Sequence, residues 1–481
     1  MVDMKTLKNI ALIGLVLTSS LCSSCSDFLD QEPSSNGSVP AFYKTETDIA
    51  QGVAAAYNAL MATSQYGANF IYLMEIRSDN TYTESITNSG GIYGDIDLFR
   101  ETSYNTVLDN TWIGCYDGIK RCNIILDRIS DVPMAEETRN KYKGEMLFLR
   151  ALTYFNMVRL WGDVPLVVHY YEDPFKAFEL GRTPLTEVYN QIKSDLIDAA
   201  KLLPAKADPS RLGGALSGSA KTLLGKVYLT LKDYNSAVQI LKEVIDSNQY
   251  KFISDYTEIF DVQNKNHSES IFEIQYTDAI TGLGSAFANL FAPIGSSEVT
   301  KGVGGTEGNN EPTEEFYSSY PDGDLRQNVS IGKLFDGRIY CKKFVKAPVL
   351  ANQSDANFIV LRYTDVLLMY AEALNEISFS ASGEAFKYLN DVRQRAGLQK
   401  YTIQEINNQD AFRDAILKER RYEFAFENQR WFDLLRTGKA VEIMNASAKG
   451  EFTVKAYQLV FPIPQSQIDA APDKMVQNAE Y

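Results

Sequence analysis

Apolar residues recur at steps of three and four along most of the chain, which is the spacing that places side chains on one face of an α-helix. In residues 111–129 they form a single stripe that includes Trp112, Cys115, Ile119 and Cys122. The same period marks 142–160, 185–203, 222–231, 234–245, 365–377 and 411–435. Strand-like runs are short and few, namely 164–169, 270–276, 338–345 and 457–461. The pattern predicts a mainly α-helical protein with minor β-sheet.

A repeat signal lies within these helices. In residues 217–247, Gly225 stands one turn before Tyr228, and Ala237 and Leu241 follow in the second helix. These offsets are those of a tetratricopeptide repeat, in which small residues let two antiparallel helices pack closely. Weaker echoes of the same spacing are found at Ala54/Tyr57, Ala151/Tyr154 and Ala371/Leu374. Any antiparallel helical hairpin needs small residues at its close approach, so for these echoes a repeat and a generic hairpin both remain open.

Two long segments, 66–110 and 277–310, lack helical periodicity. The first sets seven aromatic residues among Asn, Asp, Thr, Ser and Gly, and the second is glycine-rich with two phenylalanines near its middle. Loops of this length are usually functional or disordered. Because disordered segments are poor in aromatic residues, we expect the first segment to be an ordered, functional loop.

The first 24 residues have the layout of a secretory signal peptide. Lys5 and Lys8 precede an apolar run at 10–17, and small residues follow up to Ser24. The apolar run is too short to span a bilayer, which takes about 20 residues. We therefore expect an exported chain that starts at Cys25. Cleavage there would remove Cys22, so the apparent Cys-Ser-Ser-Cys pair would not exist in the mature protein.

Charge and residue usage narrow the chemistry. The formal net charge is −15, which disfavours nucleic acid and anionic lipid headgroups as partners. The chain has two histidines and no HExxH or paired CxxC motif, so we expect no bound metal and no cofactor. Asp322-Gly-Asp324 could hold calcium, but its turn-forming residues favour a simple turn. Cys115 and Cys122 stand too far apart on one helix to bond, and we expect no structural disulfide.

No catalytic motif stands out either. GxSxG is absent from the sequence, and His169 and His267 lie in unrelated contexts. A carboxylate pair of the glycosidase kind is harder to dismiss in a chain rich in Asp and Glu, because the required separation is spatial. A binding protein is favoured over an enzyme.

Several motif-like segments run in order along the chain: CSDFLDQEP (25–33), WIGCYDGIKRCNIIL (112–126), FLRALTYFNMVRLWGDVPLV (148–167), LRYTDVLLMYAEALNE (361–376), LNDVRQRAGL (389–398), ERRYEFAFENQRWFDLLRTGK (419–439) and the ending from 461 onward. Together they resemble the RagB/SusD family of outer-membrane nutrient-binding lipoproteins of Bacteroidota.

The resemblance implies a tetratricopeptide-like superhelix of helical hairpins with long irregular loops. It divides the chain into a lipoprotein signal peptide at 1–24 and a SusD-like domain at 25–481. Within that domain it implies helical repeats up to about 250, and a ligand loop with a further repeat at about 270–481. It also implies a lipid on Cys25, attachment to the outer membrane facing the exterior, and a SusC-like TonB-dependent transporter as partner. The family's ligand is a glycan or, in some members, a peptide.

The ligand is expected in the loops rather than in the shared motifs. The charged residues between Glu419 and Arg436 are spaced at three and four, which ion pairs explain. Sugar recognition needs flat aromatic faces together with planar amides and carboxylates. Residues of this kind in the two loops are Arg77, Asp79, Asn80, Tyr82, Tyr93, Tyr104, Phe287, Phe291, Asn309 and Asn310. For each single aromatic, packing of its own loop is an equal alternative. A surface glycan hydrolase, and a structural partner of the transporter that binds no ligand, also remain open.

Overall fold

The structure is a computed structural model, and it describes residues 42–173, 175–209, 211–280, 282–447, 449 and 452–481. The predicted signal peptide and Cys25 lie outside these residues. Among the helices described, none has both the length and the apolar character needed to cross a membrane.

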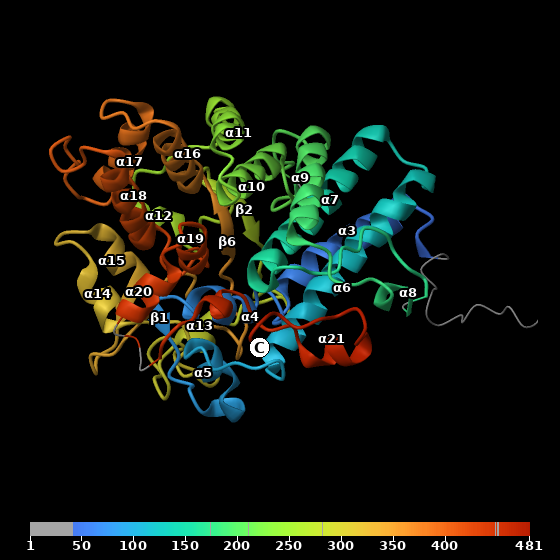
Figure 1. Ribbon diagram of the computed structural model, residues 1–481, viewed down its shortest axis with the longest axis horizontal. Helices are drawn as coiled ribbons and strands as arrows, with labels where there is room; N and C mark the ends of the chain where they lie inside the picture. Colours follow the sequence, from blue (N-terminus) through green and yellow to red (C-terminus); the bar gives the residue numbers. More distant parts are fainter. Residues whose placement is uncertain (1–41, 174, 210, 281, 448, 450–451) are drawn as a thin grey trace, which may run out of the picture.

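Long helices form a curved array in which each packs against its neighbours in the chain (Figure 1). In order they are α3 (Glu46–Met61), α6 (Thr106–Arg128), α7 (Glu136–Trp161), α9 (Leu185–Leu202), α10 (Ser217–Thr230), α11 (Tyr234–Asp246), α16 (Tyr363–Ile377), α17 (Glu384–Arg395) and α18 (Gln409–Glu423). α7 packs between α6 and α9, and α11 connects the α10 hairpin to α16. This confirms the predicted superhelix of helical hairpins.

Gly225 shows why a small residue is needed in the α10–α11 hairpin. A Cβ atom at this position would lie 2.4 Å from Cδ2 of Leu241 on the facing helix. A side chain at this position would force Leu241 to move, so glycine lets the two helices pack closely in their present arrangement. The close antiparallel packing predicted from the spacing of Gly225, Ala237 and Leu241 is confirmed.

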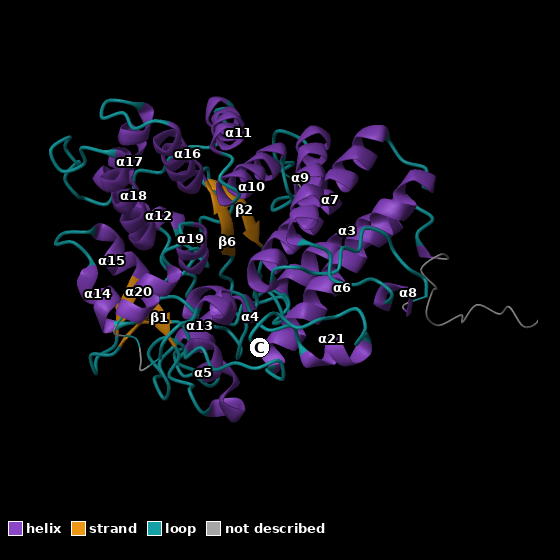
Figure 2. Ribbon diagram, in the orientation of Figure 1, coloured by secondary structure: helices purple, strands orange, loops and turns teal. Residues whose placement is uncertain are grey.

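Within the part of the chain that the structure describes, the strands form three small antiparallel pairs, and β2 and β6 lie side by side in Figure 2. β2 (Ser270–Ile274) pairs with β6 (Phe358–Arg362), with Ser270 opposite Arg362 and Ile274 opposite Phe358. β1 (Thr81–Tyr82) pairs with β3 (Glu311–Pro312), and β4 (Ile331–Lys333) pairs with β5 (Ile339–Cys341). The predicted strands at 270–276 and 338–345 are therefore confirmed in part.

The remaining α-helices are short. They are α4 (Asn69–Ile71), α5 (Ile92–Asp97), α8 (Phe175–Phe178), α12 (Tyr256–Ile259), α13 (Phe287–Phe291), α14 (Glu314–Ser319), α15 (Leu325–Ser330), α19 (Arg430–Arg436), α20 (Ala440–Ala446) and α21 (Gln465–Ala470). A π-helical turn covers Tyr72–Ile76, and 3₁₀ turns cover Asn88–Gly91, Ile129–Asp131 and Ala456–Leu459.

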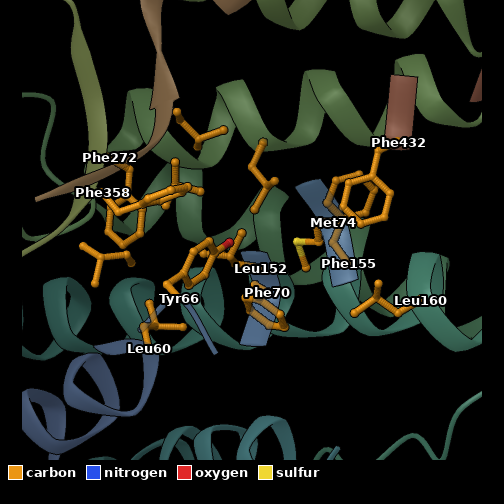
Figure 3. Packing of buried hydrophobic residues seen from close by; sticks show 14 of the residues in the cluster. Leu60, Tyr66, Phe70, Met74, Leu152, Phe155, Leu160, Phe272, Phe358 and Phe432 are labelled. Atoms are coloured by element: carbon orange, nitrogen blue, oxygen red, sulfur yellow. The ribbon is translucent and has the colours of Figure 1, made fainter. Parts of the chain in front are cut away.

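Among the residues described, the largest hydrophobic cluster joins α3, α6, α7, α9, α10, α11 and α16 with the β2–β6 pair and the first long loop, and a smaller cluster packs α16, α17 and α18 together. In Figure 3, Tyr66, Phe70 and Met74 of the loop region meet Leu152 and Phe155 of α7, while Phe272 of β2, Phe358 of β6 and Phe432 of α19 complete the cluster. Trp112 and Trp161 belong to the same core, as predicted, with ring centroids 5.2 Å apart. The first loop is thus anchored to the scaffold by its own aromatic side chains.

Three sequence predictions need correction. The segment 411–435 is not one helix but two, α18 and α19. Phe426 and Asn428 between them adopt positive φ angles of 67° and 57°, and both carboxylate oxygens of Glu75 accept their backbone N–H groups. The run at 457–461 forms a 3₁₀ turn at Ala456–Leu459, and 164–169 makes only one bridge, between Val164 and Thr183.

Most charged motif residues form a buried ion-pair network. Arg362 contacts Glu423 at 2.7 Å, Glu427 at 2.8 Å and Glu269 at 3.0 Å, and Arg395 also bonds Glu269 and Glu423. Burial opposes ionisation of Glu423, but the guanidinium groups of Arg395, Arg362 and Arg326 outweigh it and lower the pKa of this carboxyl to about 2. The prediction that ion pairs explain these charges is confirmed, and most of the pairs join different elements.

Candidate functional site

The two long loops meet and are tied together. Tyr82 lies opposite Glu311 in the β1–β3 pair, Thr83 Oγ1 donates to Asn309 Oδ1 at 2.6 Å, and the backbone N–H of Glu84 donates to Gly308 O at 2.7 Å. In Figure 1, α4 and α5 of the first loop and α13 of the second gather below the helical array. The two segments expected to carry function therefore form one unit.

A pocket of about 360 Å³ opens where this unit meets the end of α3. Its walls come from the turn after α3, both long loops and the segment before β6. The described lining residues are Met61, Ala62, Thr63, Gly67, Ala68, Asn69, Tyr72, Tyr93, Tyr276, Gly282, Gly284, Ala286, Leu290, Glu307, Asn352 and Gln353. This volume is within the range of small-ligand sites.

Two stacked tyrosines form the aromatic part of the pocket. The rings of Tyr72 and Tyr93 lie 4.3 Å apart with planes 16° from parallel. Tyr72 is buried and Tyr93 is partly exposed, and Asn309 Nδ2 donates to the Tyr72 hydroxyl at 2.9 Å. Burial and, to a lesser degree, the nearby Glu307 raise the pKa of Tyr93. Both phenols are therefore neutral at physiological pH, and the Tyr93 ring rests on a fixed support.

Amide and carboxyl groups complete the lining. Gln353 Oε1 accepts the backbone N–H groups of Gly282 at 2.9 Å and Gly284 at 3.1 Å, which fixes that wall. Asn352 is exposed, with a positive φ of 61°. Its side-chain amide makes no hydrogen bond to the residues described. Burial raises the pKa of the half-buried Glu307, against the effect of a hydrogen bond from Asn309. The pocket thus offers an aromatic ring, a free amide and a carboxyl.

The charges of the pocket limit its chemistry. Among its described lining residues there is no lysine, arginine or histidine, and Glu307 is the sole carboxyl. A lone half-buried carboxyl without a base or nucleophile beside it does not make an acid–base pair. An aromatic ring with amides and few charges suits a neutral ligand that carries both hydroxyl groups and apolar C–H faces.

Three predicted ligand residues of the first loop are structural. Arg77 forms an ion pair with Glu101 at 2.8 Å and lies over the Phe99 ring. Asp79 is bound by Arg430 at 2.8 Å, and the cations outweigh burial to lower the pKa of its carboxyl to about 2. Asn80, also fully buried, accepts from Arg421 at 2.8 Å. We correct the predicted ligand contact for all three, because none reaches the pocket or the solvent.

The predicted phenylalanines and asparagines of the second loop are also buried. Phe287 and Phe291 stack on each other in the core, with centroids 5.5 Å apart, and present no surface to a ligand. Asn309 supports Tyr72 from behind, and Asn310 is buried with a positive φ of 55°. Because these four residues are buried, we correct the predicted ligand contact for them as well.

The remaining three predicted residues keep exposed surface. Tyr93 lines the pocket, as described above. Tyr82 is partly buried and its hydroxyl donates to Glu311 Oε2 at 3.2 Å. Tyr104 is 75% exposed and lies outside the pocket. The predictions missed Glu307, Asn352 and Gln353. The signal available for the last two was the polar run ANQSDAN before β6.

Two other hollows are of similar size. One, of about 480 Å³ between α6, α8 and α21, is lined mainly by apolar and aromatic side chains, with Lys120, His169 and Gln467 among its polar groups. The other, of about 540 Å³, adjoins the pocket at Met61. The pocket at Tyr93 is the candidate site because both long loops, the segments expected to carry function, build it.

Comparison with protein-family models matches both halves of the chain. The model described as "Starch-binding associating with outer membrane" matches residues 27–229, and the model of the SusD family matches residues 323–481. The chain belongs to the RagB/SusD family. The family resemblance expected from the motifs is thereby confirmed.

Relatives and solved structures of the SusD family agree over nearly the whole length. SusD-like protein P25 of Formosa agariphila is 28% identical over 94% of this chain and 95% of its own. A laminarin-binding SusD-like protein is 28% identical and superposes with a TM-score of 0.78, covering 91% of this chain and all of the other. Surface glycan-binding protein A from Bacteroides thetaiotaomicron in complex with laminarihexaose is 25% identical, with a TM-score of 0.78 over 90% of this chain and all of the other.

Proposed function

We propose that this protein is a non-catalytic cell-surface binding protein that captures a glycan in the pocket at Tyr93 and delivers it to a TonB-dependent outer-membrane transporter. The observation that carries the proposal is the Tyr72–Tyr93 stack beside the free amide of Asn352. Solved relatives of the same fold that are described as glycan-binding support it. A lipid on Cys25 would hold the protein at the outer membrane.

Filling the pocket tests this function. Ala62 is exposed on the pocket rim, and Ala62→Trp would occupy the volume without disturbing the core. Ala470→Trp makes the same change at an exposed alanine of the apolar hollow by α21. We expect wild type and Ala470→Trp to be retained by the same polysaccharide in affinity electrophoresis, and Ala62→Trp to migrate freely. Equal retention of all three would contradict the placement of the site.

The same incubation separates a binder from an enzyme. We expect bound polysaccharide to stay intact, so that no new reducing ends form over time. An increase in reducing ends with the wild type would instead favour the glycan hydrolase. Retention by a peptide array but by no polysaccharide would favour a peptide ligand, and transporter binding without either would favour a purely structural partner.

The proposed anchor has its own test. Cys25→Ser should move the protein from the membrane fraction to the soluble fraction, because the acyl chains that would hold it are lost. Co-purification of the transporter with the wild type tests the partner. Membrane retention of Cys25→Ser after a high-salt wash would contradict the lipid anchor.

A further inference from the structure

The hollow next to the pocket follows the outer face of α3. It is lined by Ala54, Tyr57 and Asn58 of α3, and by Arg121 of α6, the 211–214 segment, β2 and Leu283. Met61 lines both hollows, and Leu283 stands between Gly282 and Gly284, which line the first. Gln275 of the second hollow is followed by Tyr276 of the first. The two hollows therefore adjoin along the last turns of α3.

The second hollow repeats the kinds of group found in the first. The Tyr57 ring is partly exposed and is held in place because its hydroxyl accepts the backbone N–H of Ala215 at 2.8 Å. Asn58 is exposed, and its amide approaches only Met61 Sδ, at 3.7 Å, among the residues described. An aromatic ring with an available amide is thus present at each end of the combined groove.

Gly213 forms part of one wall of the second hollow. Gly213 has a positive φ of 85°, and a Cβ there would lie 2.5 Å from the Gln275 side chain. Both the backbone angle and the close approach therefore favour glycine, which lets the 211–214 segment pack directly against Gln275.

The cations of the second hollow already have carboxylate partners. Arg121 shares Asp117 with Lys120, at 2.7 and 2.9 Å, and Arg211 makes a bidentate pair with Glu145 at 2.7 and 2.8 Å. The first hollow has no cation among its described lining residues. A polyanionic chain would therefore meet no unpaired cation among the described lining residues of the two hollows, and the carboxyl of Glu307 would disfavour it, whereas a neutral chain needs no cation.

We infer that the two hollows form one extended subsite, which holds a neutral polysaccharide segment running from Tyr93 over Met61 to Tyr57. This inference rests on the proposed function and adds to it the charge class and the length of the ligand. A ligand long enough to touch both rings makes contacts that a short oligosaccharide cannot make, so affinity rises with chain length.

The test blocks the second hollow alone. Ala54 is exposed on α3 and lines only this hollow, so Ala54→Trp fills it and leaves the Tyr93 pocket open. Calorimetry would use oligosaccharides of laminarin, starch and mannan from the disaccharide to the hexasaccharide, and alginate oligosaccharides of the same lengths. We expect Ala54→Trp to weaken hexasaccharide binding about tenfold and to leave trisaccharide binding unchanged, whereas Ala470→Trp changes neither.

The outcomes distinguish a failure of the extended subsite from a failure of the proposed glycan-binding function. Equal hexasaccharide affinity in Ala54→Trp and wild type would overturn the extended subsite and leave the glycan-binding pocket standing. Binding of alginate but of no neutral series would overturn the charge class. If wild type binds none of the four series and no polysaccharide of the affinity panel, the proposed function fails, and the inference fails with it.

Discussion

Polar side chains gather in two regions of this protein, and they are arranged in opposite ways. In the network around Arg362, Arg395 and Glu423, each charge meets an opposite charge at hydrogen-bond distance, and the side chains are shielded from water. In the pocket, Asn352 and Glu307 are partly exposed and no cation faces them among the described lining residues. The network presents no accessible polar group to a ligand. The pocket has polar groups that can form hydrogen bonds with one.

The buried network stabilises the fold, whereas the pocket residues can differ between proteins that bind different ligands. A buried charge that loses its partner is strongly destabilising, so the network has to be kept whole. The pocket groups lie in loops, where exchange of a side chain costs little stability. Motifs rich in charge are therefore a guide to family and fold here, and the polar loop residues are the place to look for ligand preference.

Breaking the network should give the largest effect. Arg362→Met leaves Glu269, Glu423 and Glu427 buried without one of their cations. We expect the free energy of unfolding to fall by about 3–5 kcal/mol, measured by urea denaturation followed by circular dichroism.

Arg413→Met is the matched control. Arg413 pairs with Glu376 and Asp410, but its side chain is 42% exposed, and such pairs contribute about 0–1 kcal/mol. A similar loss in both variants would remove the distinction between buried and exposed pairs. Neither variant should alter glycan affinity in protein that remains folded.

How far the sequence predicts this structure depends on whether the determining contacts are local. Helical periodicity and the Gly225 spacing are local, and both led to the correct superhelix. The contacts at the break between α18 and α19 are not local, because the backbone N–H groups there donate to Glu75, more than three hundred residues earlier in the chain.

The candidate site shows the same limit. Loop length and aromatic content identified the two segments that build the pocket, and Tyr93 within them. Which loop residues are buried is decided by distant partners, such as Arg430 for Asp79 and Gln458 for Arg77. Asn352 and Gln353 lie outside both segments, so only folding brings them to the pocket.

Glu311 is buried like the carboxylates of the network, but another carboxyl, that of Glu84, lies near it. Burial and the neighbouring Glu84 raise the pKa of Glu311 from 4.5 to about 8. The folded state therefore keeps a proton that the unfolded chain releases between these two pH values. Its stabilising contribution is complete below about pH 4.5 and is lost as the pH rises towards 8.

Glu311→Gln fixes this position in the neutral form. We expect the free energy of unfolding to depend less on pH between 5 and 8, with the variant more stable than wild type at pH 8 by at least about 1 kcal/mol. Urea denaturation across this range measures it. Glu315→Gln, at a partly exposed partner of Arg421, should keep the wild-type slope. Identical slopes for Glu311→Gln and wild type would contradict the raised pKa.

Removing the ring of Tyr93 tests the pocket with little cost to the fold. Tyr93 is partly exposed and stacks on Tyr72, which stays in place through Asn309. We expect Tyr93→Ala to weaken glycan binding about tenfold, which corresponds to about 1.4 kcal/mol, as measured by calorimetry. Tyr104→Ala removes a tyrosine that is 75% exposed outside the pocket and should bind as wild type. A stronger effect at Tyr104 would move the site away from the Tyr72–Tyr93 stack.

The smallest effect is expected at Asn352, whose amide is the free polar group of the pocket. Its positive φ of 61° would strain an alanine, so Asn352→Gly is the suitable change, because glycine adopts this angle freely. Loss of one or two hydrogen bonds to ligand hydroxyls should weaken binding about two- to threefold. Asn248→Gly makes the same change at an exposed asparagine with a φ of 51° away from the pocket, and it corrects for any effect on the backbone. Equal affinities of the two variants would show that the amide of Asn352 does not bond the glycan.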